Sequence, residues 1–283
     1  MSEPIRQYWE NRLENNYNLK GVGFYRAGIS YNYWVYRMRK KQFLDQFKKL
    51  LIHKPNPVVL EIGPGTGFYT DLMLQEGVMN ITVCDITSVA TKELARKYPG
   101  IKTFTNDIGS KECSLPPNQF DIILCLDVLF HITDGEAYKQ ALKNINGFLK
   151  EDGIAIFTEN FCPVHTFRGH ITDRTAEEIV NAFGNADFSI TYCRPMFYFL
   201  NPPVNQTSKI LWGLSNIRIV ILSFFEKSKL GFLNHIPGLF LYCTDRVLFF
   251  SGLRGFGSAL LLCKQSTPLK KYAGNSSRDP ASD

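Results

Sequence analysis

The stretch that most constrains this 283-residue chain runs from Val58 to Phe68 and reads VVLEIGPGTGF. Apolar residues, two of them β-branched, lead into Glu61 and then into glycines at positions 63, 65 and 67. This pattern is typical of a buried parallel strand that runs into a tight turn and a helix start. Side chains at such a turn would block a ligand lying against the backbone, which is why glycine suits it. The stretch therefore predicts a ligand site at the turn.

The spacing of the glycines distinguishes two kinds of nucleotide site. A dinucleotide fingerprint needs Gly-x-Gly-x-x-Gly, and its third glycine would fall at Phe68. Here the pattern is Gly-x-Gly-x-Gly, with an acid two residues before the first glycine. It resembles motif I of the class I S-adenosylmethionine-dependent methyltransferases, in particular small-molecule members similar to methyltransferase types 11 and 12. The resemblance implies S-adenosylmethionine as the cofactor, with Gly63, Gly65 and Gly67 under its amino-acid and ribose parts and Glu61 near its ammonium group.

Segments with strand and helix patterns alternate through the middle of the chain. This alternation predicts an α/β fold with a doubly wound, mostly parallel sheet, the Rossmann-like methyltransferase fold. A ligand of such a sheet lies across the carboxyl ends of its strands. In the family, the last two strands form an antiparallel edge. After the first strand we expect further strands at residues 81–85, 101–105, 122–126, 154–158, 188–192, 196–200 and 258–263, and core helices at 70–76, 88–97, 136–150 and 175–184.

Acidic residues lie at or just after several of these strand ends. Asp85 ends the second strand, and its carboxylate suits a ribose because one ionised group accepts hydrogen bonds from both hydroxyls. In the family, an acid at the position of Asp107 accepts a hydrogen bond from the adenine amino group, and Ile108 flanks the ring. The same resemblance adds Ile86 and Asp127 to the cofactor-binding residues, because the strand before Asp127 ends at the transferred methyl group in the family.

The rest of the chain is expected to cover this core. Helices before the first core strand usually form a lid in the family, and by resemblance Tyr33 or Arg37 reaches the cofactor or substrate. The alternative is that these helices only pack on the sheet. We expect an N-terminal helical lid at residues 1–52, a core at 53–200 and 257–264, a helical substrate-covering insertion at 201–256 and a disordered tail at 265–283.

The charge of the chain is concentrated at its N-terminus. Residues 1–49 contain ten Lys or Arg and four acids, which accounts for the whole net charge of +6. A general nucleic-acid binder would spread a basic face over the domain, so this distribution argues against one. It indicates either a solvated helix face or a segment that attracts an anionic substrate or surface.

Two apolar segments, residues 210–225 and 236–250, lie within the insertion. Spanning a bilayer takes ~20 predominantly apolar residues, and charges interrupt both segments. They either extend the core, form a wall for a greasy or lipid-linked substrate, or rest on a membrane surface as a peripheral contact at residues 201–257.

Seven scattered cysteines without a close pair, and an N-terminus without an apolar targeting core, indicate a reducing, cytoplasmic location. The five histidines show no spacing for a metal site. Some quinone-pathway members of the family hold a metal with a Glu-x-x-Glu-His pattern near strand four. Phe130 occupies the second acidic position here, so no metal is predicted.

Methyl transfer from a sulfonium mainly requires that the acceptor be close to the methyl carbon and aligned with it. A hydroxyl acceptor must also lose its proton, for which a histidine with an ordinary pKa near ~6.5 is the usual base. The candidates are His131, just past strand four, then His170 and His165 in the loop after strand five. For His131, a structural role at a helix start is an equal alternative.

The sequence therefore predicts an S-adenosylmethionine-dependent methyltransferase that acts on a small or amphipathic acceptor, with oxygen preferred. An N- or C-methyltransferase and a catalytically silent, methyltransferase-like binding subunit stay open as alternatives. A nicotinamide-dependent oxidoreductase is disfavoured by Phe68. The acceptor molecule and the oligomeric state are not determined by these patterns.

Overall fold

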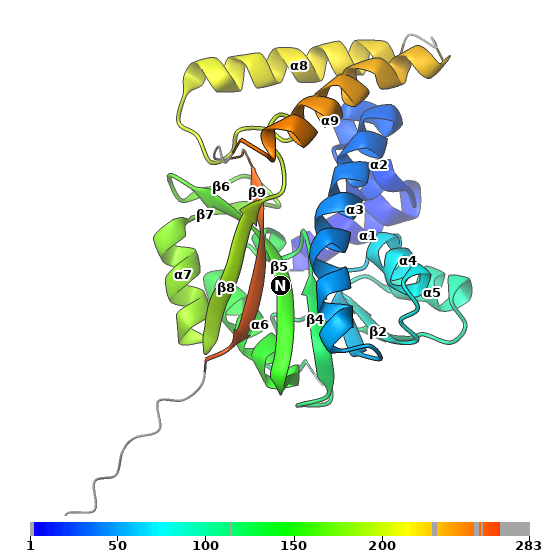
Figure 1. The fold of residues 1–283 in the computed structure, drawn as a ribbon, viewed down its shortest axis with the longest axis vertical. Coiled ribbons are helices and arrows are strands. Elements are labelled where there is room, and N and C mark those ends of the chain that lie inside the picture. The colour runs from blue at the N-terminus through cyan, green and yellow to red at the C-terminus, as the bar shows by residue number, and fades with distance from the viewer. Residues whose placement is uncertain (1–2, 114, 228–230, 252–254, 256, 267–283) are drawn as a thin grey trace, which may run out of the picture.

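A mostly parallel sheet forms the centre of the computed structural model, which describes residues 3–266 except 114, 228–230, 252–254 and 256 (Figure 1). The first five strands pair in parallel, and the last two are antiparallel. This confirms the predicted doubly wound fold with its antiparallel edge. In spatial order the strands are β3 (Lys102–Thr105), β2 (Asn80–Asp85), β1 (Val58–Ile62), β4 (Phe120–Cys125), β5 (Leu149–Cys162), β9 (Ser258–Gln265) and β8 (Phe188–Pro195).

Helices cover both faces of this sheet because its central strands are buried on both sides. Along β9, Leu260 and Leu262 point to one apolar cluster, while Leu261 and Cys263 point to the other, as the two-residue period of a strand requires. The first cluster holds α3 (Gly28–His53), α4 (Phe68–Gln75) and α5 (Ser88–Lys97), and the second holds α6 (Gly135–Phe148) and α7 (Ala176–Asn185).

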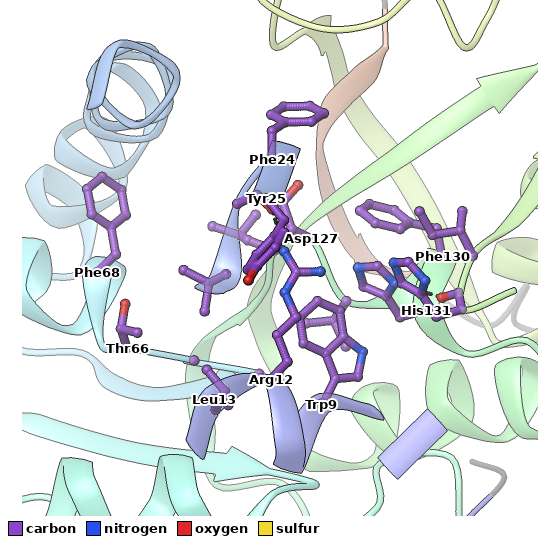
Figure 2. Close-up of a pocket in the computed structure, with 18 of the residues that line it drawn as sticks. Trp9, Arg12, Leu13, Phe24, Tyr25, Thr66, Phe68, Asp127, Phe130 and His131 are labelled. Atoms are coloured by element: carbon purple, nitrogen blue, oxygen red, sulfur yellow. Dashed lines mark hydrogen bonds between the residues drawn. The ribbon is translucent and has the colours of Figure 1, made fainter. Parts of the chain in front are cut away.

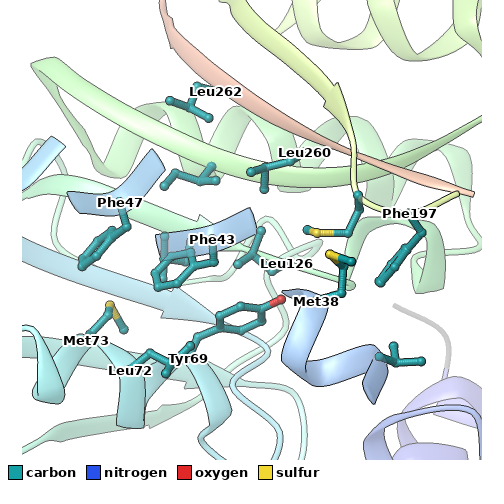
Figure 3. Close-up of a cluster of buried hydrophobic side chains, with 14 of the residues drawn as sticks. Met38, Phe43, Phe47, Tyr69, Leu72, Met73, Leu126, Phe197, Leu260 and Leu262 are labelled. Atoms are coloured by element: carbon teal, nitrogen blue, oxygen red, sulfur yellow. The ribbon is translucent and has the colours of Figure 1, made fainter. Parts of the chain in front are cut away.

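Helix α3 is the centre of the first cluster (Figure 3). Its Phe43 and Phe47 rings stack at 4.7 Å between centroids, and the Phe43 ring meets the edge of Tyr69 from α4 at 5.1 Å. The side chains of Met38, Phe43 and Phe47 are fully buried. A segment expected as a lid is therefore also part of the core, because apolar side chains recur along its buried face, which also carries polar residues such as Gln42 and Gln46.

The remaining helices lie beyond the carboxyl edge of the sheet. The longest of them, α8, crosses that end of the molecule (Figure 1). Helix α9 packs on α3, where a Cβ on Gly238 would come within 2.5 Å of the Trp34 ring. Among the described residues, no helix has the length and hydropathy needed to cross a membrane. The helices beyond the carboxyl edge are α1 (Glu3–Asn15), α2 (Leu19–Val22), α8 (Lys209–Lys227) and α9 (Ile236–Leu248). The chain also forms short 3-10 turns, η1 (Tyr25–Ala27), η2 (Leu129–His131) and η3 (Gly231–His235).

Residues 196–200, expected as a strand, do not form one. The backbone N–H groups of Tyr198, Phe199 and Leu200 instead donate to the carboxylate of Asp245, at 2.9, 2.5 and 3.3 Å. Asp245 belongs to α9 and its side chain is fully buried. A buried carboxylate must be saturated with donors, and three successive backbone amides supply them here in place of a sheet partner. The local sequence of residues 196–200 carries no sign of this distant partner.

The region after α6 also differs from the expectation. Strand β5 is 14 residues long and starts directly after α6, and the loop that follows carries a small ladder of β6 (Thr166–Phe167) and β7 (Thr172–Thr175). Strand β7 also pairs in parallel with the end of β5. Such short strands depend on their sheet partners and leave little period in the sequence. The predicted disordered tail lies, from residue 267 onward, outside the described residues.

Candidate active site

A cavity of about 1310 Å³ lies at the carboxyl edge of the sheet (Figure 2). The β1–α4 turn and the ends of β2, β3 and β4 form its floor, and residues of α1, α2, α3 and α8 form its cover. Sites for a single drug-sized ligand usually measure ~300–1,000 Å³. The cavity is therefore large enough for a cofactor together with a second molecule.

The glycine turn separates into a part that lines the cavity and a part that does not. Gly63 and Gly65 line it, with φ of 66° and 54°. A side chain on Gly63 would collide with Val128, and the left-handed backbone disfavours one in any case. Gly67 also has a positive φ, of 80°, but it lies outside the lining, and a Cβ there would meet Leu94 of α5 at 2.6 Å. The position of Gly67 thus serves the packing of α4 against α5.

Glu61 lies beneath the turn rather than in the cavity wall. Its Oε2 accepts a hydrogen bond of 2.5 Å from Thr70 Oγ1, while its buried Oε1 has no partner among the described atoms. Burial raises the pKa of Glu61 to about 8. A buried carboxyl oxygen without a partner is an acceptor that a bound ligand can satisfy, directly or through water.

Asp85 stands at the end of β2 and lines the cavity. Its Oδ1 accepts from the Thr87 amide at 2.8 Å and the Thr87 hydroxyl at 2.7 Å. Its Oδ2 accepts a long contact of 3.4 Å from the Gly65 amide. Burial raises the pKa of Asp85, and the bonds from Thr87 oppose that rise. One oxygen is thus committed to the protein, and the other stays available to hydroxyl donors.

The other predicted cofactor residues also line the cavity. Asp107 accepts from the Gly109 amide at 2.8 Å, and Ile86 and Ile108 provide apolar walls. Asp127 has a positive φ of 59° and lies 3.0 Å from Arg39 through its Oδ2. A carboxylate for hydroxyls, two isoleucines for a flat ring and an unsatisfied buried oxygen are the partners that S-adenosylmethionine needs. The residues present fit the cofactor that the glycine motif implies.

Two of the three candidate histidines meet at the opposite side of the cavity. The Nδ1 of His131 lies 2.9 Å from the backbone oxygen of His170, and the two rings stack at 5.4 Å. Because a carbonyl can only accept, Nδ1 carries the proton and Nε2 keeps its lone pair. Burial lowers the pKa of His131 to about 3 and also lowers the pKa of His170, with Arg12 adding to both effects.

His165 is not part of this group. Its side chain is half exposed, its Nδ1 lies 2.8 Å from Glu178 Oε1, and it does not line the cavity. Glu178 also accepts from the Thr175 amide at 2.7 Å in the capping box that starts α7. The structure therefore brings His131 and His170 together and places His165 at a helix start.

Helix α1 covers the histidine pair. The Trp9 ring meets the His131 ring edge-on at 4.7 Å, and the Tyr8 ring stacks on His170 at 4.3 Å. Helix α1 is anchored by Glu10, whose carboxylate accepts from the Ser88 amide at 2.9 Å and the Ser88 hydroxyl at 2.6 Å at the start of α5. A carboxylate at a helix N-terminus is stabilised by the helix dipole.

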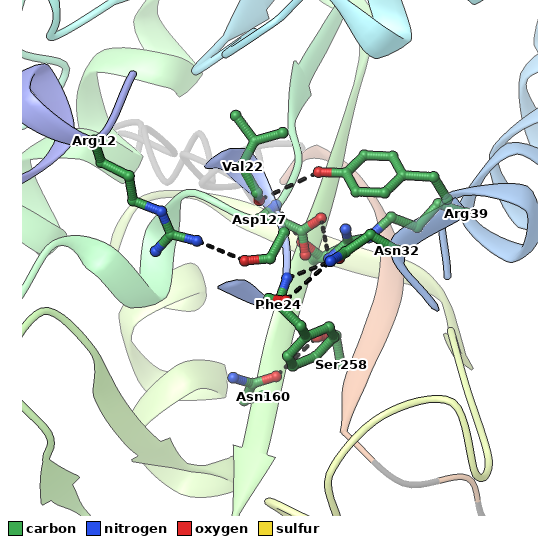
Figure 4. A network of polar contacts seen from close by, with 11 residues as sticks. Arg12, Val22, Phe24, Asn32, Arg39, Asp127, Asn160 and Ser258 are labelled. Carbon is green, nitrogen blue, oxygen red and sulfur yellow. Dashed lines mark hydrogen bonds and ion pairs between the residues drawn. The ribbon is translucent and has the colours of Figure 1, made fainter. Parts of the chain in front are cut away.

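Arg12 and Arg39 are cavity residues that were not anticipated from the sequence (Figure 4). Arg12 donates to the backbone oxygen of Gly23 at 2.6 Å, and Arg39 is buried against Asp127. Tyr33 and Arg37, expected to reach the ligands, instead point outward and do not line the cavity. Arg39 lies four residues after the buried Val35 on one helix face, so the period of α3 carried a signal, but a charged residue is normally assigned to the surface.

Comparisons with known proteins agree with this geometry. Residues 60–157 match the family model described as a methyltransferase domain. Over 108 residues the chain is 29% identical to the ubiquinone biosynthesis O-methyltransferase of Actinobacillus pleuropneumoniae serotype 7 (strain AP76). The matched segment covers 35% of this chain and 44% of that protein. The chain thus spans less than half the length of the curated relative it matches.

Solved structures share the fold at low sequence identity. A SAM-dependent methyltransferase from Leishmania major aligns with a TM-score of 0.59 over 92% of this chain and 81% of that chain, at 13% identity. Magnesium protoporphyrin IX methyltransferase from Synechocystis PCC 6803, solved with bound SAM, aligns with a TM-score of 0.52 over 93% and 95% of the chains, at 17% identity.

Residues 60–157 thus match a methyltransferase domain, and the chain has the fold of solved S-adenosylmethionine-dependent methyltransferases. The residues around Gly63 fit S-adenosylmethionine, the cofactor that the glycine motif predicted.

Proposed function

We propose that this protein methylates an oxygen atom of a small or amphipathic acceptor. The observation that carries the proposal is that His131, with its Nδ1 proton held by the His170 carbonyl, shares one cavity with the cofactor residues. The name of the curated relative, an O-methyltransferase, supports the preference for oxygen. An N- or C-methyltransferase is the alternative within the same fold.

The chain's own residues divide the work between two ends of the cavity. Asp85 would hold the ribose, Asp107 and Ile108 the adenine, and Glu61 with Gly63 the amino-acid end. When bound, S-adenosylmethionine supplies an electrophilic methyl group on a sulfonium. The protein's part is to align the acceptor, exclude water with the cover helices and remove one proton.

His131 is suited to proton removal because its Nε2 lone pair is left free by the contact at Nδ1. A pKa of about 3 keeps the imidazole neutral at pH 7 but makes it a weak base. An acidic hydroxyl, such as a phenol, matches a weak base better than an alcohol does. Arg12, in the same cavity, favours negative charge on the acceptor oxygen as its proton leaves.

A cytoplasmic location belongs to the same proposal. All seven cysteines are unpaired in the structure, and four of them are buried. Unpaired cysteines in this number suit a reducing compartment.

The first test is transfer of labelled methyl from S-adenosylmethionine into an extract of the source cells, followed by separation into lipid-soluble, water-soluble and macromolecular fractions. Label in one fraction, absent with Asp85→Ala, is the expected result. Chemical analysis of the product then identifies the methylated atom, and label on nitrogen or carbon would overturn the preference for oxygen. Cofactor binding without label in any fraction would support the silent binding subunit instead.

A further inference from the structure

Exposed apolar side chains gather on the insertion. Among the described residues, twenty large hydrophobic side chains are exposed, and eleven of them lie on α8, on α9 or just after α9. Scattered exposed hydrophobics are normal, whereas a concentration of this kind marks an interaction surface. We call these residues the apolar face: Ile210, Leu214, Ile217, Val220, Ile221, Phe224, Ile236, Leu239, Phe240, Val247 and Phe250.

Helix α8 is apolar on two opposite sides. Ile210, Leu214, Ile217, Ile221 and Phe224 follow one another at three- and four-residue steps, so they form one exposed stripe. The opposite side carries Trp212, Ile219 and the buried Leu222, and the first two of these line the cavity. A helix with apolar surface on both sides needs a second apolar partner in addition to its own protein.

Among the described side chains of the insertion, the exposed charges are basic. Asp245 is the only carboxylate among the described side chains of residues 201–251, and it is fully buried under backbone amides. Lys209 at the start of α8 is exposed, and Arg37 of α3 is exposed beside Tyr242 of α9. Basic and aromatic residues at the border of an apolar helical face match the headgroup region of an anionic bilayer.

We propose that the apolar face of α8 and α9 docks on the surface of an anionic phospholipid bilayer. The chain is held there peripherally, with the stripe of α8 at the acyl boundary. Since the inner side of the same helix lines the cavity, an amphipathic acceptor dissolved in the membrane reaches the active site past α8. This second part rests on the proposed function, whereas the docking itself does not.

Vesicle flotation tests the docking without any measurement of methyl transfer. The full-length protein is mixed with vesicles of phosphatidylcholine alone or of phosphatidylcholine with phosphatidylglycerol at 3:1. We expect flotation with the anionic vesicles, weakened at high salt, and at least a tenfold loss for the double variant Ile217→Asp with Phe224→Asp. Met79→Asp is the matched control, because Met79 is 77% exposed and precedes β2 at the amino edge of the sheet.

Two measurements keep the outcomes apart. Binding of S-adenosylhomocysteine by the double variant shows that the core is intact, so that a loss of flotation is a loss of the surface alone. Wild-type protein that stays in the aqueous fraction with anionic vesicles overturns the proposal. A wild-type dimer by light scattering that the double variant converts to a monomer, without flotation, would assign the face to a second copy of this chain. Docking without detectable methyl transfer would leave the surface established and count against the proposed function only.

Discussion

The two ends of the cavity are built in different ways. At the proposed cofactor end, the predicted cofactor residues that line the cavity lie in the glycine turn or within three residues of a strand terminus, as Gly63, Asp85 and Asp107 show. At the acceptor end, the residues come from distant segments: Trp9 from α1, His131 from η2 and His170 from the β6–β7 loop. The first end is a property of local sequence around a sheet, and the second is a property of packing.

This difference predicts that the two ends of the cavity can be changed independently. The parallel strands hold the cofactor residues at one edge with little freedom, because their positions follow from the sheet itself. The acceptor end depends on how the helices before and after the core pack over that edge. We therefore expect changes in those helices to alter the acceptor without disturbing the cofactor, and the following predictions test whether the two ends are separable.

The largest effect is expected at the acceptor end. His131→Gln keeps the volume and a hydrogen-bond donor but removes the base, so the rate of methyl transfer should fall roughly 100-fold, the lower end of the range for general-base catalysis, because a pKa of about 3 makes this imidazole a weak base. Affinity for S-adenosylhomocysteine should stay within twofold, as measured by isothermal titration calorimetry. His165→Gln is the control, because His165 lies outside the cavity. Unchanged transfer by His131→Gln would leave this histidine with a structural role only.

At the cofactor end, a substitution should mainly lower the affinity for S-adenosylhomocysteine. Asp85→Asn preserves an acceptor for Thr87 but weakens two charge-assisted hydrogen bonds to a ribose, which lowers affinity for S-adenosylhomocysteine about 100-fold. Asp152→Asn replaces an exposed carboxylate elsewhere and should leave the affinity unchanged. If Asp85→Asn bound the ligand normally, the ribose would have to be held by other residues.

Asp245 attaches the insertion to the backbone amides of residues 198–200. Asp245→Asn replaces one acceptor oxygen beneath the Tyr198 and Leu200 amides, and a buried donor without a partner should cost about 2–3 kcal/mol in the free energy of unfolding. Chemical denaturation gives this value, and limited proteolysis within residues 201–251 should become faster. Arg246→Gln on the same helix provides the matched control. A cofactor end that lost its affinity together with the insertion would show that the two ends are coupled.

The smallest effect is a dependence of stability on pH. The pKa of His131 is near ~6.5 in the unfolded chain and about 3 in the folded protein, so between these values only the unfolded chain binds the proton. The neutral imidazole of His131 therefore contributes fully to the stability of the folded state above pH ~6.5, and this contribution is lost as the pH falls toward 3. Between pH 7 and 5 the wild type should lose up to about 2 kcal/mol more than His131→Gln. Denaturant titrations of both proteins measure this difference, and equal losses would contradict an imidazole that stays neutral in the folded protein.

The core could be predicted from the sequence more fully than the helices that cover it. The alternation of apolar strands and helices predicted the sheet because each strand satisfies its period locally. The strand predicted at residues 196–200 was wrong, because the Leu200 amide donates to the carboxylate of Asp245, 45 residues away. Tyr33 and Arg37 of α3 were expected to reach the ligands. The residues of α3 that line the cavity are instead Tyr31, Tyr36 and Arg39.

The sequence alone determined the glycine turn, the acids near the strand ends and hence the cofactor class, because those residues are placed by short-range geometry next to a parallel sheet. It also marked the insertion as unusually apolar. Only the tertiary structure decided which histidines meet, that Arg39 is buried against Asp127 and that one side of α8 lines the cavity while the other is exposed. Those facts arise from contacts between residues far apart in the chain, which helix packing sets and no local pattern records.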